Sequence, residues 1–153
     1  MSILPKTTPA LPPRTSDALK ISIFYAALLV IMSVAQLFSF EDFLLHFEAI
    51  GLPVALAPII VIAEVFALPF LLRMSLSIGF RYFSMFLGWV AAGLWFFISV
   101  WMVVTHSQAL TVGFLGTVVN LIPGWWSVFM SLSLVILAIW SSWGLWPGKV
   151  TSK

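Results

Sequence analysis

The stretch PIIVIAEVFALPF, residues 58–70, decides the fold class, because a single carboxylate, Glu64, stands in an otherwise apolar run with a proline near each end. The whole chain has this character: of its 153 residues, 62% are hydrophobic and 8% are charged, and the mean hydropathy is +1.15. A water-soluble chain this short must cover its core with polar surface, and seven basic and five acidic residues are too few for that. The composition therefore predicts that a lipid bilayer surrounds the protein.

A helix that crosses a bilayer needs roughly 20 mostly apolar residues. Four segments meet this requirement: residues 21–40, 52–72, 82–104 and 125–146. They predict an all-α fold, an integral membrane four-helix bundle formed by one domain over residues 20–148. Residues 1–19, with four prolines among serine and threonine, are expected to be a mobile cytoplasmic tail. Residues 149–153 are expected to be a second, shorter cytoplasmic tail.

The basic residues predict the orientation, because Lys and Arg close to a span are retained on the cytoplasmic side. All seven fall on one side of the expected helices: Lys6, Arg14, Lys20, Arg73, Arg81, Lys149 and Lys153. We therefore expect a multi-pass protein of the cytoplasmic membrane with both termini in the cytoplasm. The pI of about 9.3 reflects this topology, and no nucleic-acid partner is expected.

The first apolar segment also has features of a signal peptide, since Lys20 precedes it and residues 33–35 read Ser-Val-Ala. Hydrophobicity, however, continues unbroken to Phe40. An uncleaved first helix is therefore the preferred interpretation.

Two connections are predicted to form a lid over the outer end of the bundle. In the first, Ser39 is expected to cap a short helix with Asp42 three positions later, and Gly51 is expected to end it. Its apolar stripe, typical of an interfacial helix, consists of Phe40, Phe43, Leu44, Phe47 and Ile50. The second connection, residues 105–124, is too apolar to stay in water, so it is expected to fold back, with a helical turn near residues 118–121.

Small residues predict where the helices approach each other, because close backbone contact drives helix association in lipid. Two stripes have the required spacing: Ser84, Gly88 and Ala92 in the third segment, and Ala57, Glu64 and Ala67 in the second. Bundle packing is the favoured interpretation of both stripes. Pro58 and Pro69 are expected to bend the second helix by freeing the carbonyl groups of Val54 and Val65.

Glu64 is the one acid inside an expected span. At 1.5 Å per residue it lies about 13 Å from Arg73, near the middle of the bilayer. An ionised acid there costs roughly 2.5–3.5 kcal/mol, and no span contains a Lys or Arg to compensate, so a protonated carboxyl is expected. At the same depth the third helix carries Trp89 and the fourth Trp140, and either indole is a candidate hydrogen-bond partner.

Tyr25 and Ser33 flank this depth on the first helix. Three interpretations of Glu64 follow. An interhelical hydrogen bond that holds the bundle is favoured, a proton-carrying, quinone or polar-ligand site is the second, and contact with a partner subunit is the third.

Polar residues near the outer end are weaker candidates. His46 and His106 are both expected there beside acidic residues, but two histidines without a fixed spacing fall short of the three or four ligands of a tight metal site. No metal is therefore assigned. Gln36 and Asn120 are expected to tie the lid to the bundle. The chain has no cysteine, so thiolate metal sites and thiol redox chemistry are unavailable to it.

The sequence FEDFLLHFEAIGLP at residues 40–53, followed by Ala57-Pro58 and Glu64, resembles the DoxX-like membrane proteins over roughly residues 21–146. In that family a Gly-Leu-Pro turn and an acid in the second helix are familiar, and they map onto residues 51–53 and Glu64. The related MauE-like branch has paired cysteines before its last helix. Here the comparable residues 112–116 read VGFLG, so the thiol chemistry of that branch is not implied.

The resemblance implies a small non-catalytic accessory subunit of a membrane redox complex, either quinone-linked or otherwise engaged in electron transfer. The alternative is a quinone- or lipid-binding oxidoreductase component that uses Glu64 as a proton carrier. A small-solute transporter is a third class, less favoured because no inverted repeat is visible. The expected partners are membrane lipids and a larger membrane complex or further copies of the chain. No cofactor is assigned, although the alternative would involve a quinone or a lipid.

Overall fold

The computed structural model describes residue 9 and residues 12–105, 109 and 111–146, and this part of the chain is helical. It contains five helices: α1 (Ser16–Phe38), α2 (Phe40–Ala49), α3 (Leu56–Leu71), α4 (Ile78–Val104) and α5 (Trp125–Gly144). Three of them, α1, α4 and α5, are long and apolar enough to cross a membrane, and α3 is a shorter apolar helix. The structure thus confirms the all-helical fold class and indicates a membrane protein.

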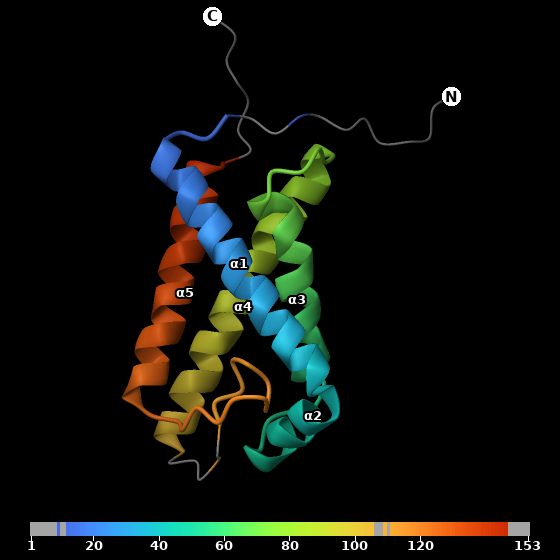
Figure 1. The fold of residues 1–153 in the computed structure, drawn as a ribbon, viewed down its shortest axis with the longest axis vertical. Helices are drawn as coiled ribbons and strands as arrows, with labels where there is room; N and C mark the ends of the chain where they lie inside the picture. Colours follow the sequence, from blue (N-terminus) through green and yellow to red (C-terminus); the bar gives the residue numbers. More distant parts are fainter. Residues whose placement is uncertain (1–8, 10–11, 106–108, 110, 147–153) are drawn as a thin grey trace, which may run out of the picture.

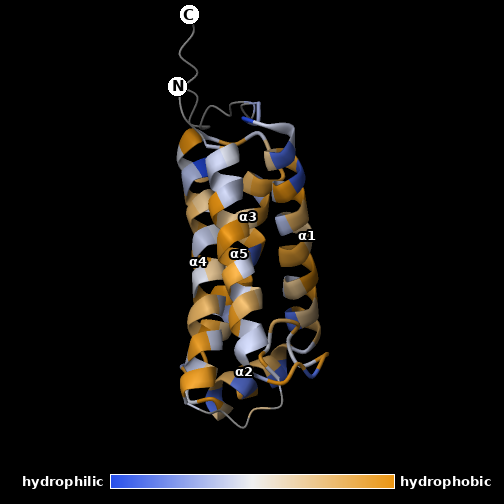
Figure 2. Ribbon diagram, turned by 90° about the vertical axis from the view of Figure 1, so that its left-hand side faces the viewer, coloured by the Kyte–Doolittle hydropathy of each residue, from blue (hydrophilic) through white to orange (hydrophobic). Residues whose placement is uncertain are grey.

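Helices α1, α3, α4 and α5 run side by side along the long axis of the molecule (Figure 1). α1 packs against α3 and α5, and α4 packs against the same two helices. The short helix α2 lies at one end of this assembly, beside α3 and the end of α1. α1 begins and α5 ends at the opposite end, and apolar residues cover much of the long sides between the two ends (Figure 2).

Helix α1 begins earlier than the expected residue 21. The Thr15 side chain accepts a hydrogen bond from the backbone N–H of Ala18 at 3.1 Å, and this cap starts the helix at Ser16. Residues 16–19, which were assigned to the tail, are therefore helical. Just before the cap, the backbone N–H of Arg14 donates to the carbonyl oxygen of Gly144 at 3.0 Å. This bond joins the start of α1 to the end of α5.

The expected cap of α2 is wrong in detail. Ser39 does precede the helix, but its side chain makes no capping bond. Its hydroxyl instead donates to the carbonyl oxygen of Ala35 at 3.2 Å and accepts from the backbone N–H of Thr117 at 3.0 Å. Gly51 follows the helix with a φ of +75°, which a residue without a Cβ adopts without strain, so the expected end is confirmed.

Helix α3 is shorter than the expected segment 52–72, because residues after Gly51 form a turn before the helix begins at Leu56. Pro58 is the third residue of α3, where the missing N–H would have no partner within the helix. The carbonyl of Val54 is not freed, since it accepts from the backbone N–H of Ala57 at 3.1 Å. The predicted effect of Pro58 is therefore wrong.

Near Pro69 the side chain of Ser84 from α4 joins the backbone of α3. Its hydroxyl lies 2.6 Å from the carbonyl oxygen of Phe66 and 3.0 Å from the backbone nitrogen of Phe70. A neighbouring helix thus supplies hydrogen bonds where proline interrupts the pattern of α3.

The two stripes of small residues lie in the interior, as expected. All six members are buried: Ser84, Gly88, Ala92, Ala57, Glu64 and Ala67. A Cβ added at Gly88 would lie 3.5 Å from the Cβ of Ala67, so the backbones of α3 and α4 approach closely there. The hydroxyl of Tyr25 from α1 donates to the carbonyl oxygen of Gly88 at 2.9 Å. These contacts join α1, α3 and α4.

The ends of α4 and α5 differ by a few residues from the expected ones. α4 begins at Ile78 rather than at residue 82, because the Ser77 side chain accepts from the backbone N–H of Phe80 and caps the helix. α5 begins at Trp125, as expected, and ends at Gly144, two residues earlier than expected.

Candidate functional site

The polar centre of the structure is the carboxyl group of Glu64, which is completely buried between α1, α3 and α4. The indole N–H of Trp95 donates to its Oε1 at 2.7 Å, and the side-chain amide of Gln36 donates to the same oxygen at 3.2 Å. The hydroxyl of Ser33 lies 2.8 Å from Oε2. We call Ser33, Gln36, Glu64 and Trp95 the Glu64 cluster.

The hydrogen bonds of the Glu64 cluster fit a protonated carboxyl. The Ser33 hydroxyl lies 2.8 Å from both Glu64 Oε2 and the carbonyl oxygen of Leu29, but it has only one hydrogen to donate. A proton on Oε2 would donate to Ser33, whose own hydrogen would go to Leu29. Oε1 would remain the acceptor for Trp95 and Gln36. Every hydrogen then has a partner, which is what burial in an apolar interior requires.

The expected donors to Glu64 were the wrong tryptophans. Trp89 donates its indole N–H to the hydroxyl of Ser142 at 3.1 Å, and Trp140 is half-exposed on α5. Trp95 is the donor instead, because depth along the bilayer does not fix the direction in which a side chain points. The sequence did contain the signal, since Trp95 follows Ala92 by three residues and so continues the buried stripe of α4.

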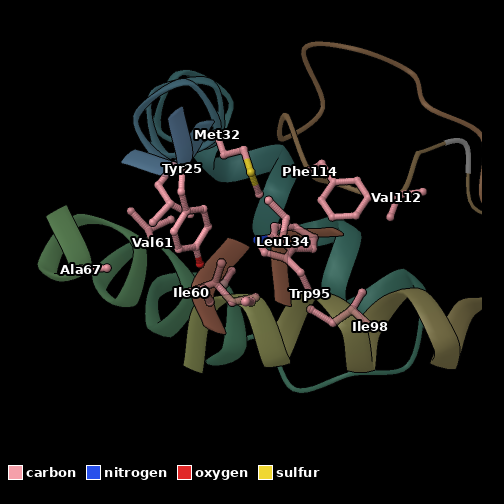
Figure 3. Packing of buried hydrophobic residues seen from close by; sticks show 14 of the residues in the cluster. Tyr25, Met32, Ile60, Val61, Ala67, Trp95, Ile98, Val112, Phe114 and Leu134 are labelled. Carbon is pink, nitrogen blue, oxygen red and sulfur yellow. The ribbon is translucent and has the colours of Figure 1, made fainter. Parts of the chain in front are cut away.

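The loop of residues 111–121, which we call the covering loop, lies over the Glu64 cluster. The amide of Gln36 donates to the carbonyl oxygen of Phe114 at 3.2 Å, so the predicted tie from Gln36 is confirmed. The Phe114 ring lies beside Trp95, with ring centroids 4.8 Å apart (Figure 3). Phe43 of α2 contacts Trp95 from another side, with centroids 6.4 Å apart. Trp95, the indole donor to Glu64, thus packs against aromatic side chains of α2 and of the covering loop.

The covering loop has its own hydrogen bonds. The backbone N–H of Val112 donates to the carbonyl oxygen of Leu121 at 2.8 Å, and this bond closes the base of the loop. The backbone N–H of Gly116 donates to the carbonyl oxygen of Gly113 at 2.9 Å, so a tight turn lies at residues 113–116. The expected helical turn near residues 118–121 is wrong. Gly113 and Gly116 both have positive φ values, which explains why the chain turns there.

Gly116 also permits the closest approach of the loop to α1. A Cβ at this position would overlap the hydroxyl of Ser39 and would lie 3.0 Å from the carbonyl oxygen of Ala35. Any side chain here would push the loop away from the bundle. The covering loop is therefore fitted to the end of α1 by the absence of a side chain.

The remaining candidates do not form a site together. His46 is buried on α2, where its ring lies against Gly113 of the covering loop, and His106 lies outside the described residues. Burial lowers the pKa of His46, and the Val112 backbone beside it offsets part of this effect. Asn120 is exposed, and its side chain makes no hydrogen bond within the described part of the chain, so its expected tie is not found. The described residues contain no group of three metal-ligating side chains.

An apolar groove of about 250 Å³ lies next to the Glu64 cluster. α1, α5 and the covering loop line it, with residues that include Ile31, Met32, Phe114, Leu121, Met130 and Leu134. Phe114 belongs to both features, because its ring contacts Trp95 on one side and lines the groove on the other. Phe114 thus contacts a member of the Glu64 cluster and also lines the groove.

No protein-family model, curated protein or solved structure matches this chain.

Proposed function

We propose that this protein is a small, non-catalytic accessory subunit of a larger membrane complex. The observation that carries the proposal is the Glu64 cluster: its acid is fully buried, and the hydrogens of its neighbours are used within the protein. A carboxyl group arranged in this way joins helices, and its hydrogen bonds are made to the protein rather than to a substrate. The same bonds continue through Gln36 to the covering loop. The acid therefore acts as a structural tie for three helices and their cover.

In this proposal α1, α3, α4 and α5 all cross the membrane. α3 has 16 residues and spans about 24 Å, whereas the hydrocarbon core is about 30 Å thick. Local thinning of the bilayer and the turns that flank α3 would accommodate the difference. α2, with an exposed acidic side and a buried Phe43 and Phe47, would lie at the outer surface beside the covering loop. Both termini would lie in the cytoplasm, on the side of the basic residues.

The redox character of the partner complex rests on the resemblance to DoxX-like proteins. The proposed structural role of Glu64 does not depend on that resemblance, because the contacts of the Glu64 cluster support it. Purification in a mild detergent, followed by identification of the co-purifying chains, tests the accessory role. Stable recovery with a larger redox complex is the expected result. Recovery of the chain alone, at full yield and in every detergent, would contradict the proposal.

The Glu64→Gln variant tests the structural role of the acid most directly. Its amide can accept at one atom from Trp95 and Gln36 and can donate at the other to Ser33, so the bonding pattern is kept without a titratable proton. We expect the variant to assemble as the wild type does and to leave the electron-transfer rate of the complex unchanged. An assembled complex without activity would show instead that Glu64 carries a proton.

Reporters fused at both ends and after Ala109 test the membrane topology. The terminal reporters should be active in the cytoplasm, and the reporter after Ala109 should be active outside. The opposite pattern at either terminus would invert the proposed orientation.

A quinone- or lipid-binding role is the second candidate, and one arrangement favours it. Phe114 lines the apolar groove, and its carbonyl oxygen accepts from the amide of Gln36, whose Oε1 is buried without a hydrogen-bond partner among the described residues. A hydroxyl on the head of a long-chain ligand would satisfy this acceptor if Phe114 turned aside. Extraction of the purified protein and analysis of the bound isoprenoid molecules separates the two candidates. A stoichiometric quinol, or the quinone that it forms by oxidation in air during extraction, would favour the second.

A further inference from the structure

A second apolar groove lies on α5, at the end of the molecule opposite to α2. It has a volume of about 340 Å³ and is lined by Ile136, Ile139, Trp140 and Trp143, without polar surface. All four side chains are about half-exposed, between 46% and 53%. A groove with this lining on a helix that is apolar enough to cross a membrane faces acyl chains.

The end of this groove carries a positive charge at a fixed place. The backbone N–H of Arg14 donates to the carbonyl oxygen of Gly144, which holds Arg14 against the last turn of α5. Its guanidinium lies over the Trp143 ring, 5.2 Å from the ring centroid. Trp143 also lines the groove, so the cation and the apolar surface meet at one side chain.

The charge of Arg14 is not neutralised by an acid within the described part of the chain. The nearby acid Asp17 pairs with Lys20 instead, with 3.4 Å between its Oδ1 and the Lys20 Nζ, and both side chains are exposed. Guanidinium groups bind phosphate through paired N–H donors, and a guanidinium on an aromatic ring keeps its edge available for them. Arg14 can therefore receive an anionic phosphate at the membrane surface.

The groove is short enough to lie within one leaflet. From Ile136 to Trp143 the groove follows α5 for about 10 Å, at 1.5 Å per residue, and half of a hydrocarbon core is about 15 Å. Tryptophan side chains favour the boundary between headgroups and acyl chains, which is where Trp143 would lie. A lipid could thus place its phosphate at Arg14 and an acyl chain along the groove.

We propose that Arg14 and the α5 groove together bind one phospholipid with an anionic headgroup. This inference rests on the proposed insertion of α5 into the membrane. It assigns the phosphate of the lipid to Arg14 and an acyl chain to Ile136, Ile139 and Trp140. A second protein helix is the competing occupant, but the groove offers such a helix no polar partner, whereas a lipid satisfies both the apolar lining and the cation.

The test uses the full chain and two lipids with the same acyl chains, phosphatidylglycerol and phosphatidylcholine, titrated in detergent and followed by native mass spectrometry. Wild-type protein should bind phosphatidylglycerol about fivefold more tightly, since one basic residue near a membrane surface contributes that much. Arg14→Gln should abolish the preference, and Arg73→Gln, at the end of a helix that does not pack against α5, should retain it. Inorganic phosphate should not displace the lipid.

The groove is tested separately by substitutions that introduce a larger side chain. Ile139→Trp should fill it and weaken the binding of both lipids, whereas Ile62→Trp adds the same bulk to exposed surface on α3 and should not. Membrane fractionation of each variant comes first: a wild-type chain absent from membranes would defeat the proposed membrane insertion itself. A chain that is inserted but shows no headgroup preference, or an Ile139→Trp variant that binds as the wild type does, would overturn this inference alone. A preference retained in Arg14→Gln would also overturn it.

Discussion

The two ends of the molecule are held together by different interactions. At the α2 end, buried neutral donors such as Trp95 and Gln36 reach a buried acid, and the covering loop fits against α1 through a glycine. At the opposite end, arginines make the contacts: Arg14 lies over Trp143, and Arg81 donates to the carbonyl oxygen of Pro9 at 3.3 Å. Basic side chains lie at this end and exposed acidic side chains lie on α2, because charge is costly away from water or headgroups.

This difference predicts that the α2 end is sensitive to the shape and hydrogen-bonding capacity of single side chains. The opposite end should respond in addition to charge and to the surrounding lipid. Four changes test the comparison, and the largest effect is expected first.

Gly116→Ala should have the largest effect, a loss of about 3 kcal/mol, because it combines a left-handed backbone with overpacking against α1. The new Cβ would overlap the Ser39 hydroxyl and displace the covering loop. The measurement is unfolding in detergent, together with hydrogen exchange of residues 111–121. Gly93→Ala on α4 is the matched control, since a Cβ there meets nothing within 4 Å. Equal stability of the two variants would mean that the loop is not closely fitted.

Glu64→Leu should follow, with a loss of about 2 kcal/mol, because the buried donors of Trp95 and Gln36 lose their acceptor. Glu64→Gln should lose less than half of this, since an amide keeps both kinds of partner. The measurement is the free energy of unfolding of the two variants relative to the wild type. If both lose the same amount, the hydrogen-bonding account of the Glu64 cluster is incorrect.

Ser84→Ala should cost about 1 kcal/mol, because the hydroxyl joins α4 to the backbone of α3 beside Pro69. A double variant in which Pro69 is also replaced by Ala restores the N–H of α3, so the cost of Ser84→Ala should fall in that background. The experiment is a double-mutant cycle on the free energy of unfolding. If the free-energy changes of the two substitutions are strictly additive, the Ser84 hydroxyl does not compensate for the proline.

The smallest effect concerns pH. Burial lowers the pKa of His46 below its ordinary value of 6.5, so the folded protein binds a proton less readily than the unfolded chain does. Stability should therefore be unchanged above that value and should decrease as the pH falls below it. Hydrogen exchange of the covering loop at pH 7.5 and pH 5 measures this. The His46→Gln variant should remove the dependence, and a dependence that persists in it would exclude His46 as the cause.

Several features of the fold were predictable because they depend on local composition. Long apolar runs predicted helices, Gly51 predicted the end of α2, and the four-residue spacing of Ser84, Gly88 and Ala92 predicted a buried face. The boundaries were less predictable, because Thr15 and Ser77 extend α1 and α4 through single capping bonds that average hydropathy does not detect.

The burial of Glu64 was predictable from the sequence, because an acid within an apolar helix is costly unless the protein surrounds it. Which side chains meet it was decided only by the tertiary structure. Rotation and tilt of α1 and α4 brought Ser33, Gln36 and Trp95 to the carboxyl and directed Trp89 to Ser142 on α5. Those rotations result from close packing of all the helices at once, and a count of residues along one helix contains no information about them.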